Sequence, residues 1–203
     1  MNSTNSLILL MKEGKNRLFL LIVLASFAAD QYTKYLVSSN MVENQTIPFI
    51  SGIVDITYVR NTGAAFGIFA GKQLFLSIVT GIMLLALSVY AISQRKKISK
   101  LETVSIALIV GGGLGNLITR TIYSYVIDFF NFYFWPVFNV ADIAICIGCA
   151  LLVITVLIVE PRKQKSLESE NMYSIFAEPQ AVRARRLAKQ SRSETKRLQE
   201  ILV

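Results

Sequence analysis

Four long apolar stretches dominate the pattern of hydrophobic and polar positions along the chain. They cover about residues 18–36, 74–92, 103–118 and 140–159. Each reaches or approaches the roughly 20 residues that a helix needs to cross a bilayer. The pattern therefore predicts four transmembrane helices, joined by a short basic loop and by two longer loops at about 37–73 and 119–139.

The composition favours the same class of protein. Mean hydropathy is +0.51, 53% of residues are hydrophobic and only 17% are charged, which is typical of an integral membrane protein. The net charge of +8 would suit a nucleic-acid partner. The basic residues, however, lie in short segments between the apolar stretches and in the tail, so we expect membrane lipids and no nucleic acid as partners.

The distribution of positive charge predicts an orientation. Basic residues gather before the first stretch, between the second and third, and after the fourth: Lys12, Lys15, Arg17; Arg95, Lys96, Lys97, Lys100; Arg162, Lys163, Lys165. The other two loops contain only Arg60, Lys72 and Arg120. The positive-inside rule then places both termini in the cytoplasm and the two longer loops outside. Ala25–Ala29 also resemble a signal-peptide cleavage site, but removing the first span would break the even number of crossings.

The segments outside the spans differ in character. Residues 53–60 are rich in β-branched side chains and lie between Gly52 and Gly63, which predicts a strand of a small sheet on the membrane surface. The loop at 119–139 is crowded with aromatic residues, as in an interfacial belt. We expect a cytoplasmic N-terminus at 1–17, a four-span membrane domain at 18–160 and a basic, partly disordered cytoplasmic tail at 161–203. An amphipathic helix at 181–202 is the alternative for the tail.

Two aspartates are the first candidates for chemistry in a chain that has no histidine. Asn139 is a suitable N-cap for the last span, and Asp142 three residues later fits a capping box and the positive end of the helix dipole. Asp128, in an aromatic loop, should favour its neutral form. We hypothesise a dyad that shares one proton, with Asp142 as base and Asp128 as acid. Taken singly, Asp142 could be only a cap and Asp128 only a surface residue.

Other polar and small residues follow helical spacing. Asn116 and Arg120 are four apart near the end of the third span, and Asp30 and Lys34 are four apart in the first. We interpret the second pair as structural, because the opposite charges offset each other's burial. The glycine-rich run at 111–115 predicts close helix packing, without the flanking features of a nucleotide loop. Cys146 and Cys149 could bind metal or carry out redox chemistry, but packing residues are expected.

Five short motifs in order resemble those of lipoprotein signal peptidase (signal peptidase II), a family of bacterial aspartic endopeptidases. They are Asp30-Gln-Tyr-Thr-Lys34, Asn61-Thr-Gly-Ala-Ala-Phe66, Gly115-Asn-Leu-Ile-Thr-Arg120, Val126-Ile-Asp-Phe129 and Phe138-Asn-Val-Ala-Asp142. The resemblance covers about residues 17–160. It implies an all-α transmembrane fold, a four-helix bundle with a small extracytoplasmic β-cradle and a short amphipathic helix.

The resemblance also implies an activity and a set of site residues. Asp128 and Asp142 would be catalytic, and eight further residues would support the site or bind substrate: Asp30, Lys34, Asn61, Gly63, Asn116, Arg120, Asn139 and Ala141. The substrate would be a diacylglyceryl-modified prolipoprotein, cut on the amino side of the lipidated cysteine. The enzyme would be a monomer of the bacterial inner membrane, without metal or cofactor and with its active site on the outer face.

Three departures and two rival functions accompany this resemblance. Thr119 replaces the usual Asp before the arginine, the segment between the two aspartates is short, and the tail is long. A proton-coupled transporter could use Asp30 and Asp142 as carriers, although internal repeats are not evident. A Ser–Lys protease could use Lys34, although no motif surrounds the nearby hydroxyl residues.

Overall fold

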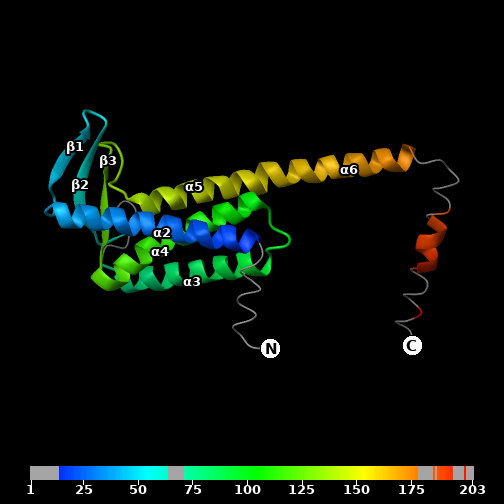
Figure 1. Cartoon of the computed structure of the whole chain (residues 1–203), viewed down its shortest axis with the longest axis horizontal. Helices are drawn as coiled ribbons and strands as arrows, with labels where there is room; N and C mark the ends of the chain where they lie inside the picture. The colour runs from blue at the N-terminus through cyan, green and yellow to red at the C-terminus, as the bar shows by residue number, and fades with distance from the viewer. Residues whose placement is uncertain (1–13, 64–70, 178–184, 186, 194–198, 200–203) are drawn as a thin grey trace. The chain divides into compact units, whose positions relative to one another are not determined.

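The computed structural model describes residues 14–63, 71–177, 185, 187–193 and 199. The chain divides into two compact units, Met1–Thr155 and Val156–Val203. The first unit contains helices α2 (Gly14–Asn40), α3 (Gln73–Ser93), α4 (Lys100–Tyr123) and α5 (Val140–Ile154), and strands β1 (Thr46–Ile50), β2 (Val54–Asn61) and β3 (Val126–Asn131). These helices lie side by side, and the sheet lies across one end of them with its strands transverse to the helices (Figure 1).

Helices occupy all of the apolar stretches from which spans were predicted. Within the described residues, three are long and apolar enough to cross a membrane: α3, α4 and the helical run Val140–Glu170. Helix α2 has 27 residues but is not among them. Lys15 and Arg17 at its start, and Asp30, Gln31 and Lys34 in its second half, lower its hydropathy.

Helix α4 packs against each of α2, α3 and α5. Its start is fixed by a capping box in which Ser99 and Glu102 exchange hydrogen bonds. Its glycines provide the close contacts, as the sequence predicts: a side chain at Gly111 would overlap the backbone of Val23 in α2, and one at Gly113 would overlap Leu84 in α3. Because α4 lies between the other helices, residues near its C-terminal end can reach both α2 and α5.

The sheet has strand order β1-β2-β3, and both pairings are antiparallel. Strand β2 confirms the strand predicted at residues 53–60. Strand β3 was not expected, because its residues belong to the segment interpreted as an aromatic interfacial loop. It pairs with β2 so that Asp128 is opposite Val59. The sheet packs on the end of α2 through a buried apolar cluster of Val37, Tyr58, Ile127 and Phe129.

After α5 the chain continues as a π-helical turn, η2 (Thr155–Val159), and helix α6 (Glu160–Ala177). No helix was predicted for the residues of α6, which belong to the tail expected to be partly disordered. The amphipathic helix considered for residues 181–202 falls largely outside the described residues, as do Lys12 and residues 64–66 of the second motif. The described part of the two long loops contains no short amphipathic helix of the kind that the family resemblance implies.

Candidate active site

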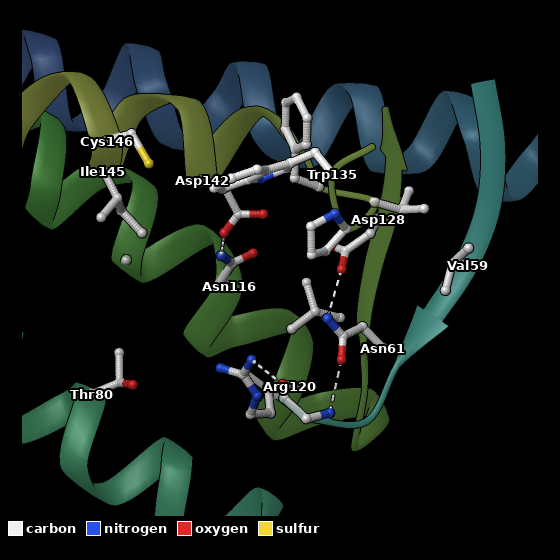
Figure 2. A pocket seen from close by; sticks show the side chains of 16 residues that line it. Val59, Asn61, Thr80, Asn116, Arg120, Asp128, Trp135, Asp142, Ile145 and Cys146 are labelled. Atoms are coloured by element: carbon white, nitrogen blue, oxygen red, sulfur yellow. Dashed lines mark hydrogen bonds between the residues drawn. The ribbon is translucent and has the colours of Figure 1, made fainter. Parts of the chain in front are cut away.

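A cavity of about 580 Å³ lies where α4, α5 and the sheet meet. Asp128 on β3 and Asp142 in the first turn of α5 both line it (Figure 2). The other lining residues come from β2 and the residues just after it, from β3, from α3, α4 and α5, and from the segment that joins β3 to α5: Val59, Asn61, Gly63, Thr80, Gly113, Asn116, Arg120, Val126, Trp135, Pro136, Val137, Phe138, Ile145 and Cys146. The two aspartates proposed from the sequence therefore face one cavity.

The start of α5 holds Asp142 in place. The side chain of Asn139 accepts a hydrogen bond from the Asp142 amide at 3.0 Å, and Asp142 Oδ2 accepts one from the Asn139 amide at 3.0 Å. This reciprocal capping box confirms the cap predicted from the spacing of the two residues. Asp142 thus caps the helix with one oxygen while Oδ1 is directed toward α4.

Asp128 is held by two amide side chains from different elements. Asn61 Nδ2 donates to Oδ2 at 2.8 Å, and Asn139 Nδ2 donates to Oδ1 at 2.7 Å. The residue is only 3% exposed. Burial, followed by the nearby charge of Asp142, raises the pKa of Asp128 to about 7, against the opposing effect of the two amide donors. A carboxyl group with this pKa can gain or lose a proton at neutral pH.

Asn116 connects the candidate dyad to α2. Its Oδ1 accepts hydrogen bonds from Lys34 Nζ at 2.8 Å and from Asn139 Nδ2 at 3.0 Å. Its Nδ2 donates to Asp142 Oδ1 at 2.8 Å. The two donors on Oδ1 fix the orientation of the amide, so that its NH₂ group is presented to Asp142.

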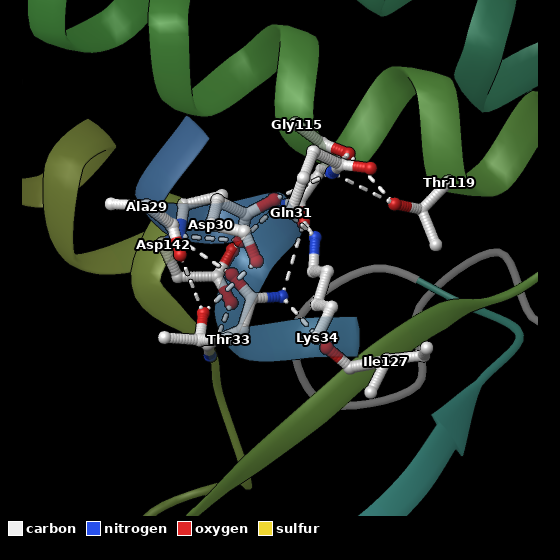
Figure 3. A network of polar contacts seen from close by, with 12 residues as sticks. Ala29, Asp30, Gln31, Thr33, Lys34, Gly115, Thr119, Ile127 and Asp142 are labelled. Carbon is white, nitrogen blue, oxygen red and sulfur yellow. Dashed lines mark hydrogen bonds and ion pairs between the residues drawn. The ribbon is translucent and has the colours of Figure 1, made fainter. Parts of the chain in front are cut away.

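Asp30 and Lys34 form a buried ion pair beside the polar residues that hold the candidate dyad (Figure 3). Lys34 Nζ is 2.8 Å from Asp30 Oδ2, and Asp30 Oδ1 accepts a hydrogen bond from the Ala141 amide at 3.0 Å. A backbone amide in the first turn of α5 therefore finds its acceptor on α2. The two opposite charges are paired and buried, as their spacing predicted, and Asp30 also ties the residue before Asp142 to the first helix.

Arg120 and Gly63 lie on the other side of the cavity. Arg120 Nη2 donates to the Gly63 carbonyl at 3.2 Å, and the Gly63 amide donates to Asn61 Oδ1 at 2.8 Å. Within the described part of the chain, Arg120 Nε is buried without a hydrogen-bond partner. Thr119 does not bond to Arg120: its hydroxyl donates to the Gly115 carbonyl at 2.9 Å and accepts from Gln31 at 3.3 Å. The unusual threonine thus joins α4 to α2.

Comparison with known proteins shows the family to which this chain belongs. The family model for signal peptidase II matches residues 22–158. The chain belongs to the signal peptidase II family. It is 42% identical to a lipoprotein signal peptidase of Clostridium acetobutylicum, covering 71% of this chain and 96% of that protein. It is 40% identical to a lipoprotein signal peptidase of Bacillus subtilis, covering 73% and 98%.

Solved structures agree with this assignment. A bacterial membrane enzyme determined in meso at 2.3 Å resolution superposes with a TM-score of 0.64 at 36% identity, covering 68% of this chain and 87% of that one. A second, at 1.9 Å, gives 0.63 over 69% and 92%. The chain is thus an aspartic peptidase of the signal peptidase II type and a multi-pass membrane enzyme with several apolar helices and a small sheet.

The membership confirms the resemblance drawn from the five motifs, and nothing in it supports the transporter. The Ser–Lys alternative also lacks support in the structure. Lys34 Nζ is bound to Asp30 and Asn116, whereas the Thr33 and Ser38 hydroxyls donate to backbone carbonyls of α2. Neither hydroxyl is hydrogen-bonded to the lysine.

All ten of the site residues taken from the sequence lie close together in the structure. Eight of them lie around the cavity or in its polar network, and Gly63 and Arg120 lie on the opposite wall of the cavity. Sequence reasoning missed Trp135, Thr80 and Cys146, which also line the cavity. Trp135 was interpreted as part of the aromatic belt and Cys146 as a packing residue. Cys146 follows Asp142 by four residues, and this helical spacing could have placed it on the cavity side of α5.

Proposed function

We propose that the chain removes signal peptides from diacylglyceryl-modified prolipoproteins by cutting on the amino side of the lipidated cysteine, with Asp128 and Asp142 as its catalytic pair. The observation that carries the proposal is that both carboxyl groups, drawn from a strand and from a helix N-terminus, face one cavity and are held by a shared network. The lipoprotein signal peptidases that the chain resembles support the choice of substrate.

The reaction needs one ionised and one protonated carboxyl group. The ionised group removes a proton from water, and the resulting hydroxide attacks the scissile carbonyl to give a tetrahedral intermediate. The other carboxyl donates its proton to the leaving nitrogen as the C–N bond breaks, so the pair ends with its protons exchanged. Asp142 suits the first role because backbone and amide donors bind both of its oxygens, and the raised pKa of Asp128 suits the second.

Arg120 is placed to bind the peptide backbone of the substrate. Its guanidinium lines the cavity, and Nε lacks a partner among the described residues. A buried donor without an acceptor is unfavourable, and a substrate carbonyl would supply the missing acceptor. The apolar part of the cavity wall, which includes Ile145, Val126 and Trp135, would then contact side chains of the substrate.

The arrangement in the membrane follows from the same proposal. The chain would span the inner membrane four times, counting α2, with both termini in the cytoplasm and the sheet and dyad on the outer face as a cradle for the substrate. In support, Lys15 Nζ donates to the carbonyls of Arg95 and Ile98, so the basic start of α2 lies beside the basic α3–α4 connection. We further propose a catalytic unit at 18–160, a basic tail at 161–203 and a monomeric enzyme.

Two amide substitutions test the catalytic pair. Asp128→Asn and Asp142→Asn should each lower the rate of cleavage of a lipidated prolipoprotein by about 10³-fold or more, since each removes an acid–base group. Glu43→Gln is the matched control, because Glu43 is an exposed carboxylate on the same side of the molecule, paired with Arg60. Cleavage by either Asn variant within tenfold of the wild-type rate would refute the assignment.

A labelling experiment tests the orientation. In a chain with Cys146 and Cys149 replaced by Ser, a single cysteine at Ser124 should react with an impermeant thiol reagent applied from outside. One at Ser169 should react only after the membrane is permeabilised. Both positions are exposed. The reverse pattern would overturn the orientation without affecting the assignment of the dyad.

A further inference from the structure

A loop between the two candidate catalytic residues forms one wall of the cavity. We call residues 132–137 the aromatic loop. Its base is closed by Phe130 and Phe138, whose backbones exchange hydrogen bonds of 2.8 and 3.1 Å. The rings of Phe132 and Phe138 stack across that base, with centroids 5.7 Å apart and planes at 11°. Trp135, Pro136 and Val137 of the loop, with Phe138, line the cavity.

The far part of the aromatic loop is attached to the sheet through Tyr133. Tyr133 Oη donates a hydrogen bond of 2.6 Å to Oδ2 of Asp55 on β2. Asp55 is only 7% exposed, and it lies opposite Asn131 in the strand register. Its carboxylate is not part of the network around Asp128 and Asp142. The proposed reaction therefore leaves a buried acidic group unexplained.

The backbone at Tyr133 indicates that this attachment holds the loop in an unfavourable conformation. Its φ is +31°, in the left-handed region that a non-glycine residue seldom occupies. Such a conformation is unfavourable and persists only where the surroundings enforce it. A hydrogen bond to a carboxylate is stronger than one between neutral groups, so the bond from Tyr133 to Asp55 can hold this conformation. Tyr133 itself is 63% exposed, so packing does little to hold it.

We propose that Tyr133 and Asp55 are positioning residues for substrate binding: their hydrogen bond fixes the aromatic loop so that Trp135 forms the wall against which the peptide is seated. Without the bond, Tyr133 can relax toward negative φ, and the backbone shift reaches Trp135 two residues later. The dyad is unaffected, because Asp128 and Asp142 are held by Asn61, Asn116 and Asn139. The bond acts on substrate affinity and leaves the chemical step unchanged. This role rests on the proposed function.

The single tryptophan of the chain is Trp135, so its fluorescence reports on this wall directly. We would measure quenching by acrylamide in the purified, substrate-free protein, and KM and kcat with a lipidated prolipoprotein. The variants are Tyr133→Phe, which removes the donor, Asp55→Ala, which removes the acceptor, and Asp55→Asn, which keeps an acceptor oxygen. Tyr123→Phe is the matched control, because Tyr123 is exposed on the same side but does not line the cavity.

Tyr133→Phe and Asp55→Ala should change the quenching constant of Trp135 by about twofold and raise KM by about three- to tenfold, with kcat within twofold of wild type. Asp55→Asn and Tyr123→Phe should behave as wild type. The proposal is overturned if Tyr133→Phe matches Tyr123→Phe in both measurements, or if it lowers kcat while quenching is unchanged. It is also overturned if Asp55→Asn is as impaired as Asp55→Ala. A wild-type protein inactive on the prolipoprotein would refute the proposed function, while the quenching result would still test the hydrogen bond.

Discussion

The raised pKa of Asp128 predicts that its replacement by asparagine stabilises the protein in a pH-dependent way. Burial is the main cause of the rise from 3.8 to about 7, and the charge of Asp142 is the second. Asp128 therefore binds its proton more tightly in the folded chain than in the unfolded chain. Its contribution to folding becomes less favourable as the pH rises from about 4 to about 7, and is constant above that.

The size of the effect follows from the same values. A rise from 3.8 to about 7 corresponds to about 4 kcal/mol between acidic and neutral pH. Asp128→Asn has no proton to lose, so this penalty is absent. In the variant, an NH₂ group replaces one of the two oxygens to which Asn61 and Asn139 donate. The protonated carboxyl of the wild type likewise presents an OH group to one of these donors, so this mismatch is common to the variant and to the wild type in acid, and the raised pKa of Asp128 already includes it.

The test therefore compares the melting temperature of Asp128→Asn with that of the wild type at each pH. We would follow thermal unfolding in detergent by the fluorescence of Trp135, between pH 4 and pH 8. The melting temperature of Asp128→Asn relative to wild type should rise by on the order of 10 °C between about pH 4 and about pH 7 and then become constant. Glu43→Gln, at an exposed position, should show no comparable trend. A difference that is flat or falls with rising pH would refute the reasoning.

Three further outcomes are expected. If Asp128 is the acid, kcat/KM for a lipidated prolipoprotein should fall as the pH rises through about 7, and a rate that still increases above pH 8 would contradict this role. Asn116→Ala should lower kcat by about 10- to 100-fold in the same assay, because a hydrogen bond to a charged group contributes about 1.5–3 kcal/mol; a kcat within twofold of wild type would exclude that contribution. Gly115→Ala should reduce the melting temperature and the yield of folded enzyme, because its Cβ would overlap the Asp30 carboxylate, whereas Gly81→Ala, whose Cβ would lie 3.9 Å from Leu117, should be tolerated. Equal behaviour of the two alanine variants would show that close packing at Gly115 is unimportant.

Helices α2, α3, α4 and α5 could be predicted from the sequence because each contains a long apolar run, and long periodic or apolar segments are the strongest local signal. Helix α6 is polar and could not be predicted in this way. Strand β3 could not. Its residues Val126–Asn131 place an aspartate between apolar and aromatic side chains, which resembles an interfacial belt as much as a strand. Pairing with β2, more than sixty positions earlier, distinguishes the two. Long-range pairing of this kind leaves little trace in a short window of sequence.

The site was predictable where its residues are close in sequence. The capping box of Asn139 and Asp142 follows from their spacing, and so does the shared face of Asn116 and Arg120. The bond from the Ala141 amide to Asp30 does not, because it joins residues 111 positions apart. The family motifs indicated that Asp30 and Ala141 belong to one site. Only the fold shows that they are hydrogen-bonded to each other.

The charges around the cavity give an independent reason for a dyad that holds one proton. Three buried or half-buried acids, Asp30, Asp128 and Asp142, lie near two cations, Lys34 and Arg120. With all three acids ionised, this group has one negative charge in excess, which is unfavourable where water is excluded. One bound proton restores neutrality. Asp30 is paired with Lys34 at 2.8 Å, and Asp142 accepts a hydrogen bond from a backbone amide at a helix N-terminus. Asp128, on a strand and almost fully buried, is the remaining place for the proton.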